Sequence, residues 1–179
     1  MMSAFQTTID LRFAVSDVVG NRTISDVFPR LVELAEADLN SRLRTRWQIR
    51  DATLTFADGE AALPPDFLEL IRVGGRAPGT FQVTSWSIAI PGRVGDVAAQ
   101  YFARIPSLMS SPTATNWLLQ RYPSVYLYGV ALEAAKFLKD AGLATSTAGL
   151  YGDALRQLTV DDERARWSMA TVRVKGLTP

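Results

Sequence analysis

Residues 52–63 read ATLTFADGEAAL, and their apolar side chains recur at every second position. The run passes through Asp58-Gly59, a dipeptide that strongly favours a two-residue hairpin turn. Residues 97–105 (VAAQYFARI) alternate in the same way until Pro106, which cannot donate to a strand ladder, ends the run. Strict alternation is typical of strands with one buried face. These patterns predict a small antiparallel β region over about residues 47–105.

Three further stretches belong to the middle of the chain. Residues 81–90 are rich in Val, Trp, Ile and Thr and end at Pro91-Gly92, so we expect another strand there. Residues 74–79 (GGRAPG) predict a loop, and residues 106–115, rich in Pro, Ser and Thr, predict a connector between the β region and the C-terminal part of the chain.

Outside the β region, apolar residues recur at steps of three and four, the spacing of one helix face. The apolar stripes lie within residues 8–19, 25–46, 123–139 and 145–167. Lys136 and Lys139, followed by Gly142, are typical of a helix end. We therefore expect a mainly α (α+β) fold, a helical bundle with an inserted small antiparallel β region and an extended C-terminal arm.

The predicted organisation is a single domain over residues 1–168, with helices at about 8–46 and 116–168, followed by the arm at 169–179. The arm reads MATVRVKGLTP, contains no acidic residue and has valines that no helix stripe could bury. A strand-like segment of this kind can gain its hydrogen bonds by adding to the edge of another chain.

The composition excludes several classes of enzyme. The 179 residues carry 19 Lys+Arg against 18 Asp+Glu, and they include no His and no Cys. Disulfides, Cys-ligated or His-ligated zinc, thiol nucleophiles and Ser-His-Asp catalysis are thereby excluded. We expect no cofactor and no metal.

Charge and hydropathy bear on possible partners. A formal net charge of +1 is too small to indicate nucleic-acid binding from composition. No apolar run approaches the roughly 20 residues that span a bilayer, and no signal peptide is visible, so we expect no membrane association and synthesis in the cytoplasm.

Glycosidase catalysis is the one familiar hydrolytic mechanism that the composition does not exclude, because it needs only two carboxyl groups that flank a sugar bond. The candidates are Glu60, Asp66, Glu69 and Glu133. The acidic run Asp161-Asp162-Glu163 cannot converge on one cation from consecutive helical positions. We favour ordinary solvated carboxylates and expect no enzymatic activity, with a glycosidase as the alternative.

Two basic clusters could meet phosphates or an acidic protein surface. They comprise Arg42, Arg44, Arg46 and Arg50, and Arg164, Arg166, Arg173 and Lys175. A solvated face explains them about equally well. The predominance of arginine, which pairs bidentately, slightly favours an interface.

Aromatic residues crowd the helices near the C-terminus. Three tyrosines between residues 122 and 128 cannot all lie on the face that Leu127 and Val130 bury, and exposed Tyr and Trp are typical interface anchors. The predicted interface comprises Tyr122, Tyr126, Tyr128, Tyr151, Trp167, Arg173, Val174 and Lys175. The alternative is a helix buried on two sides within its own core.

Several short motifs, in their order and spacing, resemble the head–tail adaptor (head–tail connector) proteins of tailed bacteriophages. They are EADLN at 36–40, LPPDFL at 63–68, YFARIPSL at 101–108, TNWLL at 115–119, RYP at 121–123, YLYG at 126–129, EAA at 133–135, FLKD at 137–140 and DERARWS at 162–168. The resemblance covers most of residues 27–168.

The resemblance implies a structural subunit that assembles into a ring, typically a dodecamer, without enzymatic activity. The implied partners are the portal protein, a tail or stopper/nozzle protein, further copies of the chain, and genomic DNA that passes through the lumen without sequence specificity. The implied location is the head–tail interface of the virion, after assembly in the host cytoplasm. Another neck or tail-completion subunit, or a phage cell-wall glycosidase, is the alternative.

Overall fold

The computed structural model describes residues 7–74 and 81–168, which divide into two compact units. The helical unit contains the described residues up to Ala35 and from Leu108 onward, and the β unit runs from Glu36 to Ser107. Of the described residues, 51% are helical and 21% lie in strands.

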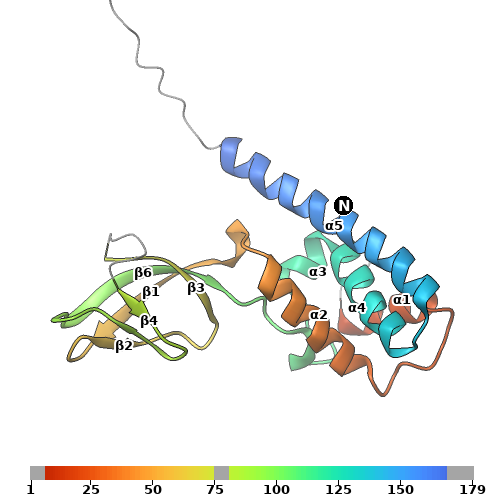
Figure 1. Ribbon diagram of the computed structural model, residues 1–179, viewed down its shortest axis with the longest axis horizontal. Coiled ribbons are helices and arrows are strands. Elements are labelled where there is room, and N and C mark those ends of the chain that lie inside the picture. Colours follow the sequence, from red (N-terminus) through yellow and green to blue (C-terminus); the bar gives the residue numbers. More distant parts are fainter. Residues whose placement is uncertain (1–6, 75–80, 169–179) are drawn as a thin grey trace, which may run out of the picture. The chain divides into compact units, whose positions relative to one another are not determined.

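The helical unit is built around a hairpin of two helices, α4 (Pro123–Phe137) and α5 (Ala141–Ser168), which lie side by side (Figure 1). Its other elements are α1 (Thr8–Val18), the first half of α2 (Phe28–Arg42), the short 3-10 helix η2 (Leu108–Ser110) and α3 (Trp117–Arg121). The largest buried side chains of this unit come from α1, α3, α4 and α5 and from η2, and include Leu11, Leu108, Leu118, Leu119, Tyr126 and Leu158.

Helix α1 begins and ends with local signals that its sequence carries. Thr7 and Asp10 form a capping box, in which each side chain accepts a hydrogen bond from the backbone N–H of the other. At the other end Gly20 adopts φ +76, and the backbone N–H of Asn21 donates to the carbonyl of Ser16 at 2.8 Å. This pattern is a Schellman motif, so the end of α1 is determined locally.

A similar motif joins α4 to α5, but a lysine takes the place of glycine. Lys139 adopts φ +55, and the backbone N–H of Asp140 donates to the carbonyl of Ala135 at 3.0 Å. The carboxylate of Asp140 then accepts a 3.0 Å hydrogen bond from the backbone N–H of Leu143 and so caps α5. The helix that precedes this joint therefore ends close to the predicted place, but Gly142 takes no part in its end, because α5 already includes this glycine.

The β unit contains two antiparallel sheets of three strands each among its described residues (Figure 1). The first has the order β1-β6-β3, with β1 (Ile49–Phe56), β6 (Gly95–Ala103) and β3 (Phe67–Val73). The second has the order β2-β5-β4, with β2 (Glu60–Ala62), β5 (Ser87–Ala89) and β4 (Gln82–Val83). The 3-10 helix η1 (Arg46–Gln48) leads into β1.

The Asp58-Gly59 turn forms as predicted, with φ +49 at Asp58 and φ +87 at Gly59. Two consecutive positive φ values are those of a type I′ turn, and the backbone N–H of Ala57 donates to the carbonyl of Glu60 at 2.8 Å. Beyond Glu60 the chain leaves β1 and pairs with β5. The turn therefore passes the chain from the first sheet to the second.

One apolar core serves both sheets, since inward side chains of the two come together in a single cluster. The alternation in the sequence identifies these side chains correctly along β1 and β6, where Leu54, Phe56, Val97 and Ala99 are buried. The stretch at 81–90 forms two short strands instead of one, because residues 84–87 make a tight turn in which the hydroxyl of Thr84 accepts from the backbone N–H of Ser87 at 3.0 Å. Strand β3 was not predicted.

The expected fold class is corrected by this β unit. We expected a mainly α fold, a helical bundle with a small β insertion, in which the strands add to a core formed by the helices. The strands instead bury their own core as a separate compact unit of two sheets, so the fold is mixed α+β. The division into a domain over residues 1–168 and an arm at 169–179 stays a prediction, since the arm lies outside the described residues.

Candidate assembly interface

The structure places the predicted interface residues in three different environments. Tyr126 is 0% exposed and Tyr151 is 5% exposed, whereas Tyr122 and Tyr128 are partly exposed. Trp167 lies in the last turn of α5, and Arg173, Val174 and Lys175 lie outside the described residues. The expectation that these tyrosines face outward is therefore wrong at Tyr126 and Tyr151, and the interface as a whole stays a prediction.

Tyr126 and Tyr151 are buried because α4 has neighbours on several sides. Helix α4 contacts α1, α3 and α5, so a single apolar stripe underestimates the width of its buried surface. Tyr126 accepts a 2.8 Å hydrogen bond from the side-chain amide of Asn116, which satisfies its hydroxyl inside the unit. Tyr151 packs against Gly129, where an added Cβ would lie 3.1 Å from the ring. These contacts give the YLYG motif a structural role within the subunit.

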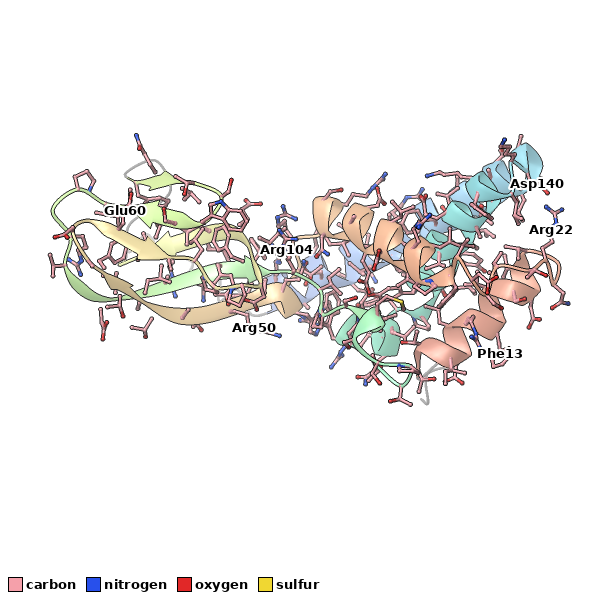
Figure 2. All side chains as sticks on the ribbon, turned by 90° about the horizontal axis from the view of Figure 1, so that it is seen from below. Phe13, Arg22, Arg50, Glu60, Arg104 and Asp140 are labelled. Atoms are coloured by element: carbon pink, nitrogen blue, oxygen red, sulfur yellow. The ribbon has the colours of Figure 1, made fainter. Side chains whose placement is uncertain are left out.

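The helical unit instead exposes a set of aliphatic and phenylalanine side chains. They are Ile9 (38% exposed) and Phe13 (60%) on α1, Leu34 (50%) on α2, Phe137 (53%) on α4 and Leu150 (46%) on α5. Figure 2 shows Phe13 on the outside of α1. Ile9 and Phe13 are four residues apart and so share one helix face, opposite the buried Leu11 and Val15. The i, i+4 spacing of apolar residues outside the predicted stripe is the signal that could have identified this face.

A groove of about 460 Å³ lies beside the exposed face of α1. The groove is lined by Thr8, Ile9 and Arg12 of α1, by Phe28, Pro29 and Glu33 of α2, and by residues 108–112. Thr8 closes one wall, because its hydroxyl donates to the carbonyl of Leu108 at 2.9 Å. The groove is thus a fixed, largely apolar feature of the helical unit.

The β unit exposes apolar side chains at its loops. Trp86, between β4 and β5, is 84% exposed, and Val94, just before β6, is 73% exposed. Val83 on the edge strand β4 is 44% exposed. Exposed large apolar side chains commonly mark surfaces that other proteins cover. The sequence predicts a strand over residues 81–90, and this pattern does not indicate that the side chain of Trp86 faces solvent.

The first basic cluster is largely engaged within the β unit. Arg44 pairs with Glu69 at 2.5 Å, Arg42 pairs with Asp38 at 2.8 Å, and the guanidinium of Arg46 lies 4.3 Å from the ring centroid of Trp47. In the second cluster, Arg166 pairs with the buried Asp162 at 2.8 Å. The acids that pair with these arginines are distant in sequence or one helical turn away. Each basic cluster therefore appears in the sequence without an acidic partner among its own residues.

The four candidate glycosidase carboxylates make structural contacts or face solvent. Glu69 pairs with Arg44, Glu133 with Lys136 at 2.6 Å, and Glu60 is exposed on β2. The carboxylate of Asp66 accepts a 2.8 Å hydrogen bond from the hydroxyl of Tyr101. None of the four lines either of the two depressions of about 460 Å³.

The Tyr101–Asp66 contact perturbs the tyrosine. Burial, and then the hydrogen bond and the negative charge of Asp66, raise the pKa of Tyr101 to about 12, while the charge of Arg50 acts in the opposite direction. The ring of Tyr101 also stacks on Phe67, with 5.8 Å between the ring centroids. These contacts tie the start of β3 to β6.

Within residues 7–74 and 81–168, no group of three or more acidic side chains is placed to hold a metal ion. No helix in this part of the chain is long and apolar enough to cross a membrane.

Both units thus expose large apolar side chains, which commonly mark surfaces that other proteins cover. The comparison with protein families identifies the class further. The chain matches the family described as SU10 adaptor protein over residues 6–90 and again over residues 81–175. It belongs to this family of phage head–tail adaptors, which are structural components of the virion that interact with other virion proteins. No curated protein shows significant similarity to the chain.

Proposed function

We propose that this adaptor assembles into a ring, a dodecamer, that joins the portal of the DNA-filled head to the tail and lets the genome pass through its lumen. Assembly takes place in the host cytoplasm, and the ring has no enzymatic activity. The observation that carries the proposal is the family match over residues 6–175, which covers both units. The exposed apolar side chains of the helical unit and the β unit support it.

The C-terminal arm supplies the contact with the portal in this proposal. Residues 169–179 contain Arg173 and Lys175 but no acid, and their valines alternate with polar residues. Such a segment suits addition to the edge of a sheet in another chain. Ordering ten residues costs on the order of 10 kcal/mol of backbone entropy, so the portal must supply both pairing and burial.

Tyr122 and Tyr128 are the predicted interface tyrosines that remain accessible, and we assign them to contacts between neighbouring copies or with the portal. Trp167, at the end of α5, precedes the arm and belongs to the same contact. The β unit contacts the tail or its stopper/nozzle protein. Genomic DNA meets the ring without sequence specificity, consistent with the net charge of +1.

The experiment mixes the purified chain with the purified portal protein of the same phage and images the product by negative-stain electron microscopy. The expected result is a ring added to the portal. Truncation after Ser168 should leave the subunit folded, as judged by circular dichroism, but prevent it from joining portal or completing infectious heads. Rings that bind tail components and never the portal would assign the chain to another neck or tail-completion position.

The glycosidase alternative is tested separately. Lysis of purified cell walls by the chain, lost on Glu60→Gln or Asp66→Asn, would contradict the absence of enzymatic activity. A Gln100→Ala variant serves as the control, because it removes a polar side chain of the β unit that is no candidate acid or base.

A further inference from the structure

Trp86 is the most exposed large apolar side chain among the described residues, at 84%. Its backbone is nevertheless held on both sides. The carbonyl of Trp86 accepts a 3.0 Å hydrogen bond from the backbone N–H of Leu63, and the turn around it is closed by a 2.9 Å hydrogen bond from the N–H of Thr84 to the carbonyl of Ser87. The indole is therefore presented from a fixed hairpin, which lowers the entropy that a contact would cost.

The sequence segment that contains Trp86 carries no charge. Residues 81–92 (FQVTSWSIAIPG) contain neither an acid nor a base, and Val83 exposes 44% of its surface beside the turn. A rigid aromatic group on an uncharged hairpin has the properties of an anchor that inserts into a depression on another protein surface.

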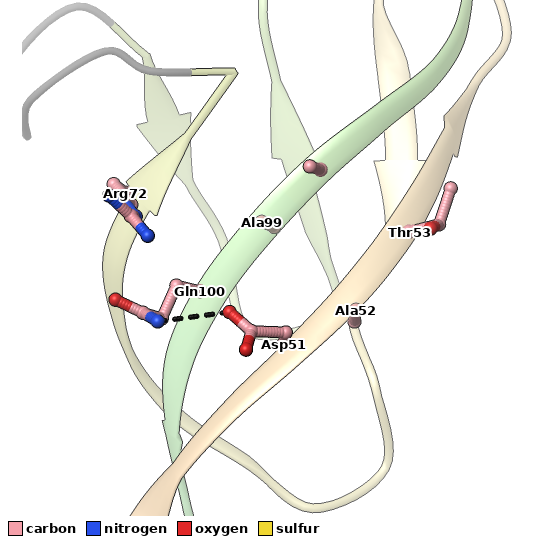
Figure 3. Close-up of a pocket in the computed structure, with 7 residues that line it drawn as sticks. Asp51, Ala52, Thr53, Arg72, Ala99 and Gln100 are labelled. Carbon is pink, nitrogen blue, oxygen red and sulfur yellow. Dashed lines mark hydrogen bonds between the residues drawn. The ribbon is translucent and has the colours of Figure 1, made fainter. Parts of the chain in front are cut away.

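A depression that suits such an anchor lies on the outer face of the first sheet of the same β unit. Its volume is about 460 Å³, and it is lined by Asp51, Ala52, Thr53, Arg72, Ala98, Ala99 and Gln100 (Figure 3). Thr53 and Ala98 are cross-strand partners on β1 and β6, and both are exposed. The small side chains at this pair leave the floor of the depression shallow and open.

Polar groups at the rim suit an indole ring. The amide of Gln100 donates to the carboxylate of Asp51 at 2.9 Å, which fixes an acceptor that an indole N–H could share (Figure 3). Arg72 on β3 lies opposite Gln100 on β6. Arg72 makes no ion pair with another residue in the part of the chain that the structure describes. A guanidinium near an aromatic face is attractive, so the depression complements both the polar edge and the π face of tryptophan.

We propose that Trp86 of one copy inserts into the depression over Thr53 and Ala98 of the next copy, so that the β units bind one another in sequence around the ring. The proposal rests on the ring of the proposed function and names one of the contacts that hold it together. Trp86 belongs to the second sheet and the depression to the first, so the two surfaces differ. A contact between two different surfaces repeats head to tail and closes into a ring when its rotation permits.

A single tryptophan supplies only part of the interface. Burial of an aromatic side chain removes roughly 150–250 Å² from solvent, whereas stable interfaces bury about 1,200–2,000 Å². Trp86 is therefore the anchor of a larger surface to which the helical unit also contributes.

Cysteine crosslinking tests the contact directly, because the natural chain has no cysteine. Ser85→Cys places a thiol beside the anchor, and Thr53→Cys places one in the depression. A short thiol-specific crosslinker should convert the double variant, mixed with portal protein where assembly needs it, into a ladder of covalent multimers. Each single variant should give no product larger than a dimer.

Substitutions in the double-cysteine background test the two halves of the contact. Trp86→Ala and the filling substitution Ala98→Leu should each reduce the ladder at least tenfold, whereas Val94→Ala, at another exposed apolar position of the β unit, should leave it unchanged. Circular dichroism and thermal unfolding should show all three variants folded like the parent chain. Ala98 and Trp86 are exposed, so neither change disturbs the core.

The outcomes separate this contact from the ring itself. Rings seen by electron microscopy without a ladder, or a ladder that survives Trp86→Ala and Ala98→Leu, would overturn the proposed contact and leave the proposed function standing. Absence of any oligomer, with or without portal, would overturn both.

Discussion

The side-chain amide of Asn116 donates a 2.8 Å hydrogen bond to the hydroxyl oxygen of Tyr126, ten residues along the chain. The other end of the same amide accepts a 2.9 Å hydrogen bond from the backbone N–H of Leu119 and so caps α3. Asn116 is 6% exposed and Tyr126 is 0% exposed. One buried side chain therefore starts α3 and ties it to α4.

Substitutions at these two residues should have unequal and coupled effects. Tyr126→Phe removes the acceptor of a buried amide and should lower the free energy of unfolding by about 1–3 kcal/mol. Asn116→Ala also removes the helix cap, which alone contributes about 0.5–2 kcal/mol, so its effect should be larger. Urea denaturation of both single variants and the double variant measures the coupling. Strict additivity would contradict a direct interaction between the two side chains.

The contact between Gly129 and Tyr151 should reverse the usual effect of a glycine-to-alanine change in a helix. Helix propensity alone predicts a gain of about 1 kcal/mol for Gly129→Ala. The new Cβ would lie 3.1 Å from the buried ring of Tyr151, so we expect a net loss in the range of overpacking, about 1–3 kcal/mol. Thermal or urea unfolding measures the sign.

Two variants control this prediction. Gly152→Ala on α5 meets no heavy atom within 4 Å and should stabilise the protein by up to about 1 kcal/mol. In a Tyr151→Leu background the penalty of Gly129→Ala should disappear, because the ring edge is gone. A stabilising Gly129→Ala in the natural chain would show that α4 and α5 are packed less closely than the structure has them.

Local signals in the sequence identify many of the elements but not how widely each is buried. Asp58-Gly59 fixes a turn by itself, and alternation along β6 names the inward side chains, because both depend on the backbone near each residue. Burial of Tyr126 depends on α1, α3 and α5 meeting around α4, which no pattern within α4 records. The fold class was misjudged for a related reason, since the separate core of the β unit arises from pairing between strands distant in sequence, such as β1 with β6.

The candidate interface could be predicted only in part. A tyrosine-rich helix was a reasonable place to expect contacts, yet Tyr126 of α4 and Tyr151 of α5 are buried within the subunit. The side chains that the structure exposes, such as Phe13 and Trp86, sit off the apolar stripe or within a short turn. Sequence patterns assign apolar residues to the core by default, so an apolar residue kept for a partner is misassigned until the subunit's own contacts are known.

Alkaline pH should destabilise the β unit through Tyr101. Its pKa is raised from 10.0 to about 12 by burial and by Asp66, so the folded state binds the phenolic proton more tightly than the unfolded state does. This contribution to stability is complete below pH 10 and is lost as the pH rises toward 12. Denaturation midpoints measured between neutral and alkaline pH should fall less steeply in Tyr101→Phe.

Asp66→Asn provides the matched variant. It keeps an oxygen that can accept from the hydroxyl but removes the negative charge, so the pKa of Tyr101 should move back toward its usual value. Ultraviolet absorbance of tyrosinate follows this shift. An unchanged titration of Tyr101 in Asp66→Asn would contradict the contribution of the charge.

Acid should destabilise the joint between α4 and α5 through Asp140. The hydrogen bond from the backbone N–H of Leu143, and then the hydrogen bond from Arg22 at 2.9 Å, hold the pKa of Asp140 below 3.8. Figure 2 shows Arg22 and Asp140 close together in the helical unit. A lowered pKa means that the stabilisation is present above the usual aspartate value and is lost as the pH falls through the folded-state pKa.

Variants at this joint should follow a defined order. Asp140→Ala removes both the cap and the ion pair and should lower the melting temperature more than Asp140→Asn, which keeps an acceptor for Leu143. Arg22→Gln should resemble Asp140→Asn at neutral pH. Equal effects of Asp140→Ala and Asp140→Asn in thermal scans would show that the cap contributes nothing at this position.

A substitution of Phe13 should impair assembly without impairing folding. Its side chain is 60% exposed on the face of α1 opposite the buried stripe, with the guanidinium of Arg12 5.4 Å from the ring centroid. Phe13→Ser should change the free energy of unfolding by no more than about 0.5 kcal/mol, as is usual for exposed positions. Leu11→Ala, two residues earlier and 0% exposed, should cost about 2–5 kcal/mol because it opens a cavity. In sedimentation and electron microscopy with portal present, Phe13→Ser should form fewer rings than the natural chain, while Gln157→Ala, a change at an exposed polar position of α5, should form as many. Rings at the natural yield in Phe13→Ser would show that this face of α1 stays in solvent after assembly, and a large loss of stability in the same variant would show that the ring of Phe13 contributes to the subunit's own packing.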